Sequence, residues 1–405
     1  VNKRMSGQSI HLSEEIFLAK WARKPQRSAL QEMLSIASCP GIISFALGLP
    51  APEFFPTNML AALSEQVLKK NPAALQYSPA LQTLKKQIVE LMALRGVRCH
   101  EQQIFLTAGA QQGVNLLTHL LLDQNGLIIM EEKTYTGAQQ VFALFQPKIL
   151  AVPTDQETGI DVAAIEDILS SGIRPAFIYT IPSGHNPLSV TMSWEKRIRL
   201  AELAHQYQVP VIEDDPYGFI YYNENPTPPL RSIEDKWVFY VGSFSKILGP
   251  TFRVGWIVIN ESLLQHLSIV KEATDIDTVT LTQRIISAYL ETGNLNQHLI
   301  ALRAEYRKRR DAMLTALQNH FPLGARWTIP ESGFFVWVEL PEPLDMIGLL
   351  KTAVEKEGVA FIPGQAFSVL NRDRNESCLR LNFSYSSVEN IEIGIARLAR
   401  LLKSL

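Results

Sequence analysis

Residues 243–256 read SFSKILGPTFRVGW and follow an apolar, strand-like run. In this segment Lys246 comes after Ser243 and Ser245 and before Arg253. A lysine amine can form a Schiff base with an aldehyde, and serine hydroxyls with an arginine guanidinium suit a phosphate. A lone lysine usually lies on a solvated surface, so this interpretation depends on further contacts elsewhere in the chain. The segment indicates a ligand that carries both an aldehyde and a phosphate.

The segment lies near the end of a region in which short apolar runs alternate with amphipathic stretches. We expect strands at residues 104–106, 127–130, 148–152, 176–180, 209–212, 238–241 and 256–259, and helices at 111–122, 137–145, 162–170 and 195–207. Buried strands separated by helices favour an α/β fold with a mostly parallel, seven-stranded sheet covered on both faces. Such sheets bind ligands at the carboxyl ends of their strands.

The alternation of apolar strands with amphipathic helices ends at about residue 292. We expect a long charged helix at 295–321, strands at 334–338, 359–362 and 378–383, and helices near 349 and at 388–405. These features indicate a smaller α+β domain. The expected division is therefore an N-terminal arm that crosses to the small domain (1–56), a large ligand-binding domain (57–291) and the small domain (292–405).

Composition narrows the class of protein. The chain has 405 residues, of which 46% are hydrophobic, enough for a large buried core. Its net charge of −2 gives no sign of a nucleic-acid or anionic-membrane surface, and its apolar stretches are too short to span a bilayer. Cys39, Cys99 and Cys378 are scattered, which fits a reducing cytoplasm. The sequence has no zinc-protease or P-loop motif, and we expect no metal site.

Four residues at three successive expected strand ends occur in the order and near the spacing of one family. They are Asn186, Asp214, Tyr217 and Lys246. With residues 243–256, they closely resemble the cofactor-binding residues of fold-type I enzymes that use pyridoxal phosphate (PLP), specifically the class I/II aminotransferases. The resemblance covers nearly the whole chain. It is closest to the branch of 2-aminoadipate and kynurenine aminotransferases and the effector domains of certain bacterial regulators.

Asp214 and Tyr217 stand in a D-x-x-Y spacing just after an expected strand. A carboxylate beside the pyridine nitrogen keeps that nitrogen protonated, and a tyrosine hydroxyl can donate to the ring phenolate. The alternative is an acidic turn, residues 213–215, that caps a helix. Asn186 follows another expected strand, and its amide can donate to the same phenolate. The alternative there is a plain Asn-Pro turn.

The segment TAGAQQG at residues 107–113 joins an expected strand to a helix. Backbone N–H groups at a helix N-terminus can bind an anion, and the segment resembles the family's phosphate-binding turn, with Ala110 and Gln111 as backbone donors. Read alone, it is an ordinary helix start. Tyr135 matches the aromatic residue that stacks on the pyridine ring in the family, and its alternative is core packing.

Arg380 lies inside an apolar strand, where a charge needs a partner. An arginine fork matches a carboxylate, and the resemblance implies that Arg380 holds the substrate α-carboxylate, with Asn186 and Gly48 beside the substrate. The alternative is a structural ion pair. Tyr77 matches a tyrosine that in the family reaches the phosphate of the neighbouring subunit, which implies a homodimer with shared active sites.

The resemblance implies a ping-pong transamination between an L-amino acid and a 2-oxo acid. Lys246 holds PLP as a Schiff base and is displaced by an amino acid docked on Arg380. The freed amine then moves a proton between the substrate Cα and the cofactor. Asp214 and Tyr217 complete the expected catalytic set, and Ser243, Ser245 and Arg253 the phosphate site.

Four positions depart from the family pattern. Leu47 stands where relatives usually carry a glycine, residues 78–82 lack two family glycines, Ser189 ends the usual Asn-Pro-x-Gly, and Ala110 replaces a hydroxyl residue. These departures indicate a reshaped substrate pocket, so elimination, decarboxylation and cyclisation, as in specialised metabolism, stay open as alternatives. A further alternative is the sensor domain of a transcription regulator. The roughly forty residues before the match disfavour it, since they are too few for a typical DNA-binding domain.

Overall fold

The computed structural model describes residues 41–370 and 377–404, so most of the expected N-terminal arm lies outside the described residues. Its centre is a seven-stranded sheet in the order β2-β10-β9-β8-β7-β3-β4. The strands are β2 (Ile104–Thr107), β3 (Leu127–Glu131), β4 (Lys148–Val152), β7 (Phe177–Thr180), β8 (Val211–Asp214), β9 (Val238–Ser243) and β10 (Gly255–Val258). Pairings from β9 to β4 are parallel, whereas β10 is antiparallel to both neighbours. The mostly parallel α/β sheet is confirmed.

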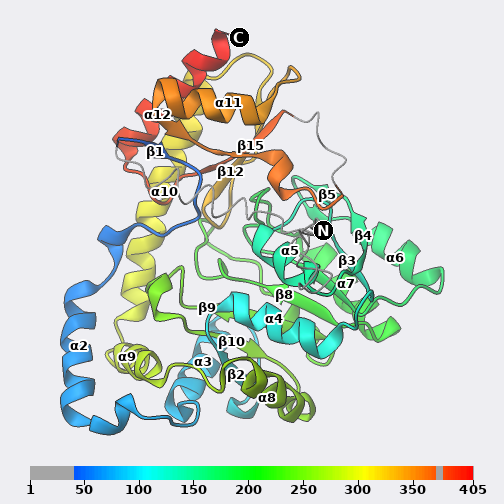
Figure 1. Cartoon of the computed structure of the whole chain (residues 1–405), viewed down its shortest axis with the longest axis vertical. Coiled ribbons are helices and arrows are strands. Elements are labelled where there is room, and N and C mark those ends of the chain that lie inside the picture. Colours follow the sequence, from blue (N-terminus) through cyan, green and yellow to red (C-terminus); the bar gives the residue numbers. More distant parts are fainter. Residues whose placement is uncertain (1–40, 371–376, 405) are drawn as a thin grey trace, which may run out of the picture.

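Helices cover both faces of this sheet because its strands alternate their apolar side chains between the faces (Figure 1). Ile128 and Met130 pack in one core with buried residues of α4, α5 and α8, whereas Ile129 packs in another with α6 and α7. The bounds are α4 (Ala110–Leu121), α5 (Thr136–Ala143), α6 (Val162–Ser170), α7 (Trp194–Tyr207) and α8 (Glu261–Asp275). Three more helices flank the sheet, α2 (Thr57–Lys70), α3 (Gln82–Leu94) and α9 (Thr280–Glu291).

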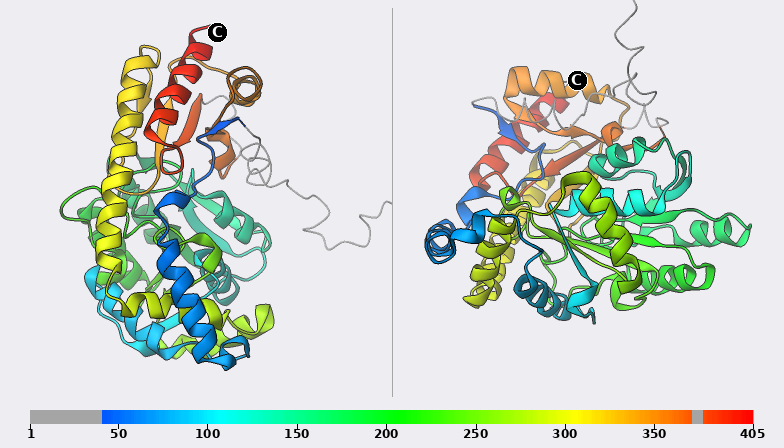
Figure 2. Two further views of the ribbon diagram at one scale, coloured as in Figure 1. Left: turned by 90° about the vertical axis from the view of Figure 1, so that its left-hand side faces the viewer. Right: turned by 60° about the horizontal axis from the view of Figure 1, so that its bottom comes forward.

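A second, antiparallel sheet of four strands has the order β11-β12-β15-β14. Its strands are β11 (Arg326–Trp327), β12 (Phe335–Glu339), β14 (Ile362–Pro363) and β15 (Cys378–Asn382), and its helices α11 (Met346–Thr352) and α12 (Val388–Lys403). The long helix α10 (Leu295–His320), yellow in Figures 1 and 2, runs beside both sheets and packs against α12. A small hairpin of β5 (Thr154–Asp155) and β6 (Gly159–Ile160) was not expected from the sequence.

Two expected strands differ from the structure. The strand expected at 359–362 is two short strands, because β13 (Val359–Ala360) pairs with β1 (Ile43–Ser44) while β14 pairs with β15. The strand expected to end at residue 212 continues through β8 to Asp214. It does so because Glu213 and Asp214 stay in register with β9. Asp214 is therefore the last residue of its strand rather than part of the following turn.

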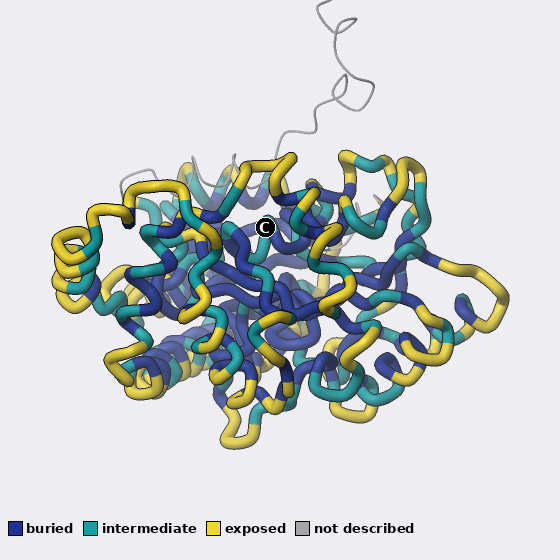
Figure 3. Tube along the Cα trace, turned by 90° about the horizontal axis from the view of Figure 1, so that it is seen from below, coloured by how far each residue is buried: buried dark blue, intermediate teal, exposed yellow. Residues whose placement is uncertain are grey.

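Buried segments gather at the centre of the molecule and exposed segments at its periphery (Figure 3). Both sheets lie in this buried region. Within residues 41–370 and 377–404, no helix combines the length and the hydropathy needed to cross a bilayer.

Candidate active site

A cavity of about 320 Å³ lies where the carboxyl ends of the parallel strands meet the second sheet. Every predicted site residue except Tyr77 lines it: Gly48, Ala110, Gln111, Tyr135, Asn186, Asp214, Tyr217, Ser243, Ser245, Lys246, Arg253 and Arg380. The strand-end rule explains why segments far apart in the sequence converge here, since parallel strands end at one edge of their sheet.

Lys246 lies just after β9, and its Nζ donates a hydrogen bond to the Gly48 carbonyl over 2.8 Å. Burial, together with the positive charges of Arg380 and Arg253, lowers the pKa of Lys246 to about 8, although the charge of Asp214 acts in the opposite direction. A lysine in this environment is partly uncharged near neutral pH, as a nucleophile and a base require.

Asp214 presents one oxygen to a partner in the protein and leaves the other free. The Tyr179 hydroxyl donates to Asp214 Oδ2 over 2.7 Å, whereas Oδ1 is buried and has no hydrogen-bond partner among the described residues. Burial raises the pKa of Asp214 to about 7, against the lowering effect of the Tyr179 hydrogen bond. A buried acceptor without a partner is costly, so Oδ1 is suited to a ligand N–H.

The opposite end of the cavity is suited to an anion. Helix α4 begins at Ala110, after Gly109 with φ of +84°, and the first-turn amides of a helix have no partner within the helix. Arg253 Nη2 donates to the Ala108 carbonyl over 2.7 Å, and the Ser243 and Ser245 hydroxyls lie 2.9 Å apart beside it. A Cβ at residue 109 would lie 2.5 Å from Arg253 Nη2, so this close approach requires glycine.

Arg380, in β15, closes the cavity from the second sheet. Its Nη1 donates to Asn186 Oδ1 over 2.6 Å and its Nη2 to the Ala46 carbonyl. The guanidinium lies between two aromatic rings, 4.0 Å from the centroid of Phe335 and 4.8 Å from that of Phe367. Burial lowers the pKa of Arg380 to about 10, so the group is still a cation at neutral pH.

Two tyrosines complete the walls. Tyr217 is buried, its ring packs edge-on against Phe334 and Phe335, and Lys246 Nζ lies 5.8 Å from its centroid. Tyr135 precedes the first turn of α5. Burial raises the pKa of both phenols, so both keep a hydroxyl proton to donate.

Tyr77 is the one predicted site residue away from this cavity. It lies between a short 3-10 turn and α3 and is 81% exposed. Its expected role concerns the cofactor of a neighbouring subunit and stays a prediction.

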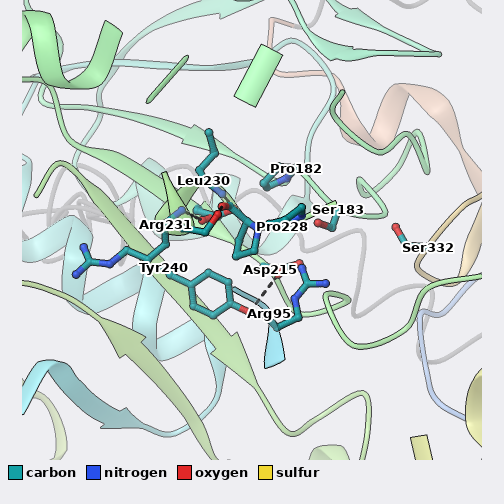
Figure 4. A network of polar contacts seen from close by, with 12 residues as sticks. Arg95, Pro182, Ser183, Asp215, Pro228, Leu230, Arg231, Tyr240 and Ser332 are labelled. Carbon is teal, nitrogen blue, oxygen red and sulfur yellow. Dashed lines mark hydrogen bonds and ion pairs between the residues drawn. The ribbon is translucent and has the colours of Figure 1, made fainter. Parts of the chain in front are cut away.

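The other two acidic residues of the 213–215 segment have structural partners, shown in Figure 4. Glu213 accepts from the backbone N–H groups of Leu230 and Arg231 over 2.7 and 2.9 Å, and burial raises its pKa to about 7. Asp215 forms a buried ion pair with Arg95 over 3.0 Å. The alternative of an acidic turn at residues 213–215 is therefore wrong: Glu213 and Asp214 belong to β8, all three carboxylates are buried, and Asp214 lines the cavity.

The same network supports the segment that carries Asn186. Arg197, fully buried on α7, donates to the carbonyls of Pro182, Met192 and Pro228 and to the Ser183 hydroxyl. These bonds attach both ends of the loop after β7 to helix α7. The position of Asn186 beside Arg380 therefore depends on a buried cation well outside the cavity.

Sequence reasoning missed Tyr179, Phe335 and Phe367. The signal for Tyr179 was available, because it pairs in register with Ile212 and strand alternation puts it on the face of Ile212 and Asp214. No local pattern identifies Phe335 and Phe367, since both lie in apolar segments and meet Arg380 only in the folded chain.

The cavity fits PLP at three points. The Lys246 amine suits the aldehyde, the free Asp214 Oδ1 suits a protonated ring nitrogen, and the α4 N-terminus with Arg253 suits the phosphate.

The sequence matches the family described as aminotransferase class I and II over residues 47–398. It is 38% identical to aromatic-amino-acid aminotransferase 1 of Thermococcus litoralis over 97% of this chain and 95% of that one. It is 37% identical to 2-aminoadipate transaminase of Thermus thermophilus over 95% of this chain and 96% of that one. The crystal structure of Pyrococcus horikoshii kynurenine aminotransferase matches with a TM-score of 0.90 at 35% identity, covering 96% and 98% of the two chains. This chain belongs to the class I and II aminotransferases, and it is a PLP-dependent enzyme of fold type I.

Proposed function

We propose that this aminotransferase moves an amino group between an L-amino acid and a 2-oxo acid by a ping-pong mechanism centred on Lys246. The observation that supports it most is the convergence in one cavity of the Lys246 amine, the free Asp214 Oδ1 and the Arg380 guanidinium. Lys246 would hold PLP covalently. The phosphate would be held by the backbone of Ala110 and Gln111 with the side chains of Ser243, Ser245 and Arg253.

Bound PLP supplies an electron sink for the negative charge that develops at the substrate Cα. Arg380 binds the substrate α-carboxylate and orients the Cα–H bond. Lys246 Nζ takes the proton from Cα, and its pKa of about 8 suits it to this work. Asp214 Oδ1 would hold the protonated ring nitrogen of PLP, Asn186 and Tyr217 would donate to its ring oxygen, and Tyr135 would contact its ring.

An absorption titration tests this function. Amino acids are added one at a time to the purified, PLP-loaded protein. Transamination replaces the visible absorption of bound PLP with the near-ultraviolet absorption of pyridoxamine phosphate and releases a 2-oxo acid. A spectral response that never yields pyridoxamine phosphate would instead establish elimination, decarboxylation or cyclisation.

The proton-transfer step of the first half-reaction, which follows displacement of Lys246 by the amino acid, is expected to speed up with pH through about 8 and then level off. The reason is that only the uncharged Lys246 amine accepts a proton, and its pKa is about 8. The measurement is single-turnover loss of visible absorption between pH 6 and 10. A rate that falls as pH rises from 7 to 9 would rule out the free amine as the base.

Tyr179→Phe is expected to weaken PLP binding by about 10-fold or more, since hydrogen bonds to charged groups contribute roughly 1.5–3 kcal/mol. The variant removes the hydroxyl that donates to Asp214 Oδ2. Tyr240→Phe is the matched control, because Tyr240 is equally buried and donates to Asp215 over 3.1 Å. PLP dissociation constants of the apoproteins should separate the two variants, and equal losses would assign both hydroxyls to folding alone.

We also propose a homodimer in which Tyr77 reaches the partner's phosphate site. Exposed apolar side chains support it: Leu75 and Tyr77 are exposed in a segment that contacts α9, and Ile276 and Val279 are exposed just before α9. Sedimentation equilibrium should give twice 45.4 kDa. A cytoplasmic location is proposed as well, because the three cysteines of the sequence, Cys39, Cys99 and Cys378, are scattered, which fits a reducing compartment.

A further inference from the structure

The walls of the cavity on the side of Arg380 are apolar. Leu47 and Leu49 come from the segment after β1, Ile362 and Phe367 from around β14, and Phe335 from β12. Leu47, Ile362, Phe335 and Phe367 are buried, and Leu49 is half-buried. A substrate whose α-carboxylate reaches Arg380 places its side chain among these groups.

Each positively charged side chain that lines the cavity already has a role in the proposed function. Among the described residues that line it, the basic side chains are Lys246, Arg253 and Arg380. Arg253 is at the phosphate end, bonded to the Ala108 carbonyl, and Lys246 is the attachment point of PLP. Arg380 is held by Asn186, Ala46 and two aromatic rings. None of the three is available for a second substrate carboxylate.

A substrate with a basic side chain meets the same difficulty. Asp214 is the one carboxylate among the described residues lining the cavity. It accepts a hydrogen bond from Tyr179, and in the proposed function its free oxygen holds the ring nitrogen of PLP. A charge placed among apolar walls without a partner loses its hydration at a large cost.

We infer that the amino donor has a neutral, apolar side chain, aliphatic or aromatic, and that Leu47, Phe335 and Ile362 select it. The inference rests on the proposed function and deepens it. Gly48 contributes through its size: a Cβ there would lie 2.6 Å from the Phe335 ring, so glycine lets this aromatic wall lie close to the Lys246 contact.

The first test measures binding separately from turnover. Calorimetry on the PLP-loaded enzyme compares 3-phenylpropanoate, a monocarboxylate with an apolar tail, with hexanedioate, whose second carboxylate would lie among the apolar walls. Neither carries an amine, so neither reacts. We expect 3-phenylpropanoate to bind at least about 30-fold more tightly, the discrimination typical of a site that offers one ligand group no partner. Equal or tighter binding of hexanedioate would overturn the inference.

The second test uses turnover. Single-turnover rates with L-phenylalanine and L-leucine are compared with those of L-glutamate and L-2-aminoadipate, and a preference of about 30-fold or more for the apolar pair is expected. Faster reaction of the acidic pair overturns the inference and leaves transamination intact. Conversion of none of the four, with 3-phenylpropanoate still bound preferentially, overturns the proposed function while the apolar selectivity of the site stands.

A variant that adds a charge at Leu47 tests whether this residue contacts the substrate side chain. Leu47→Arg supplies a cation at the wall, and Leu47→Gln has similar bulk and polarity without the charge. The arginine variant should raise the affinity for hexanedioate relative to 3-phenylpropanoate by about 10-fold or more over the glutamine variant. If both variants give the same ratio of affinities for hexanedioate and 3-phenylpropanoate, Leu47 does not contact the substrate side chain and its proposed role in selection is wrong. The wild-type comparison decides the inference even if Leu47→Arg fails to fold.

Discussion

Lys246→Ala is expected to lower the rate of transamination by at least about 10⁴-fold, because the variant loses both the covalent attachment of PLP and the base at the substrate Cα. The structure gives Lys246 no substitute. Among the described residues that line the cavity, the other basic groups are the guanidiniums of Arg253 and Arg380, which stay protonated near neutral pH. The measurement is 2-oxo acid formation, with the visible absorption of the bound cofactor recorded in parallel.

Lys246→Arg is the matched control for charge. It keeps a cation beside Gly48 but supplies neither a reactive amine nor a base, so it should be as inactive as the alanine variant. Thermal unfolding of the apoproteins checks that all three fold. Appreciable turnover by Lys246→Ala would refute the role of this lysine.

The second large effect is expected from Arg380→Leu. Removal of the guanidinium should lower kcat/KM for an L-amino acid by about 10²–10³-fold, the loss typical of one partner of a buried, hydrogen-bonded charge pair. The amine formed by decarboxylation of the same amino acid should lose far less. Since Arg380 also lowers the pKa of Lys246, the rising limb of the pH profile should move to higher pH in this variant.

Arg380→Lys separates charge from geometry. Lysine retains the positive charge but not the planar fork that Asn186 and the Ala46 carbonyl hold in place. We expect it to keep the pH profile near that of the wild type while recovering only part of kcat/KM. An equal loss for amino acid and amine in Arg380→Leu would mean that Arg380 supports the fold instead of the substrate.

The cofactor end of the site could be predicted from sequence because its residues follow successive strands of one sheet. Lys246 and Arg253 even lie within a single connection between β9 and β10. At the substrate end the sequence indicated Arg380, Asn186 and Gly48, but not the aromatic rings that contact Arg380. The two rings that contact it, Phe335 and Phe367, both come from earlier segments of the chain, and their contact with Arg380 depends on how the second sheet packs. The break between β13 and β14 was missed for the same reason, since the partner of β13 is β1, more than three hundred residues earlier.

Arg380 belongs to the four-stranded antiparallel sheet, whereas Asp214 ends β8 of the seven-stranded sheet and Lys246 lies in the connection after its strand β9. A substrate that contacts Arg380 and Lys246 together therefore connects two sheets that share no hydrogen-bonded strands. By thermodynamic linkage, a ligand at one hundred times its dissociation constant adds about 2.7 kcal/mol to the free energy of unfolding. In this protein the added stability applies to the contact between the two sheets. Saturation with substrate is therefore expected to make the two sheets unfold together as one cooperative unit.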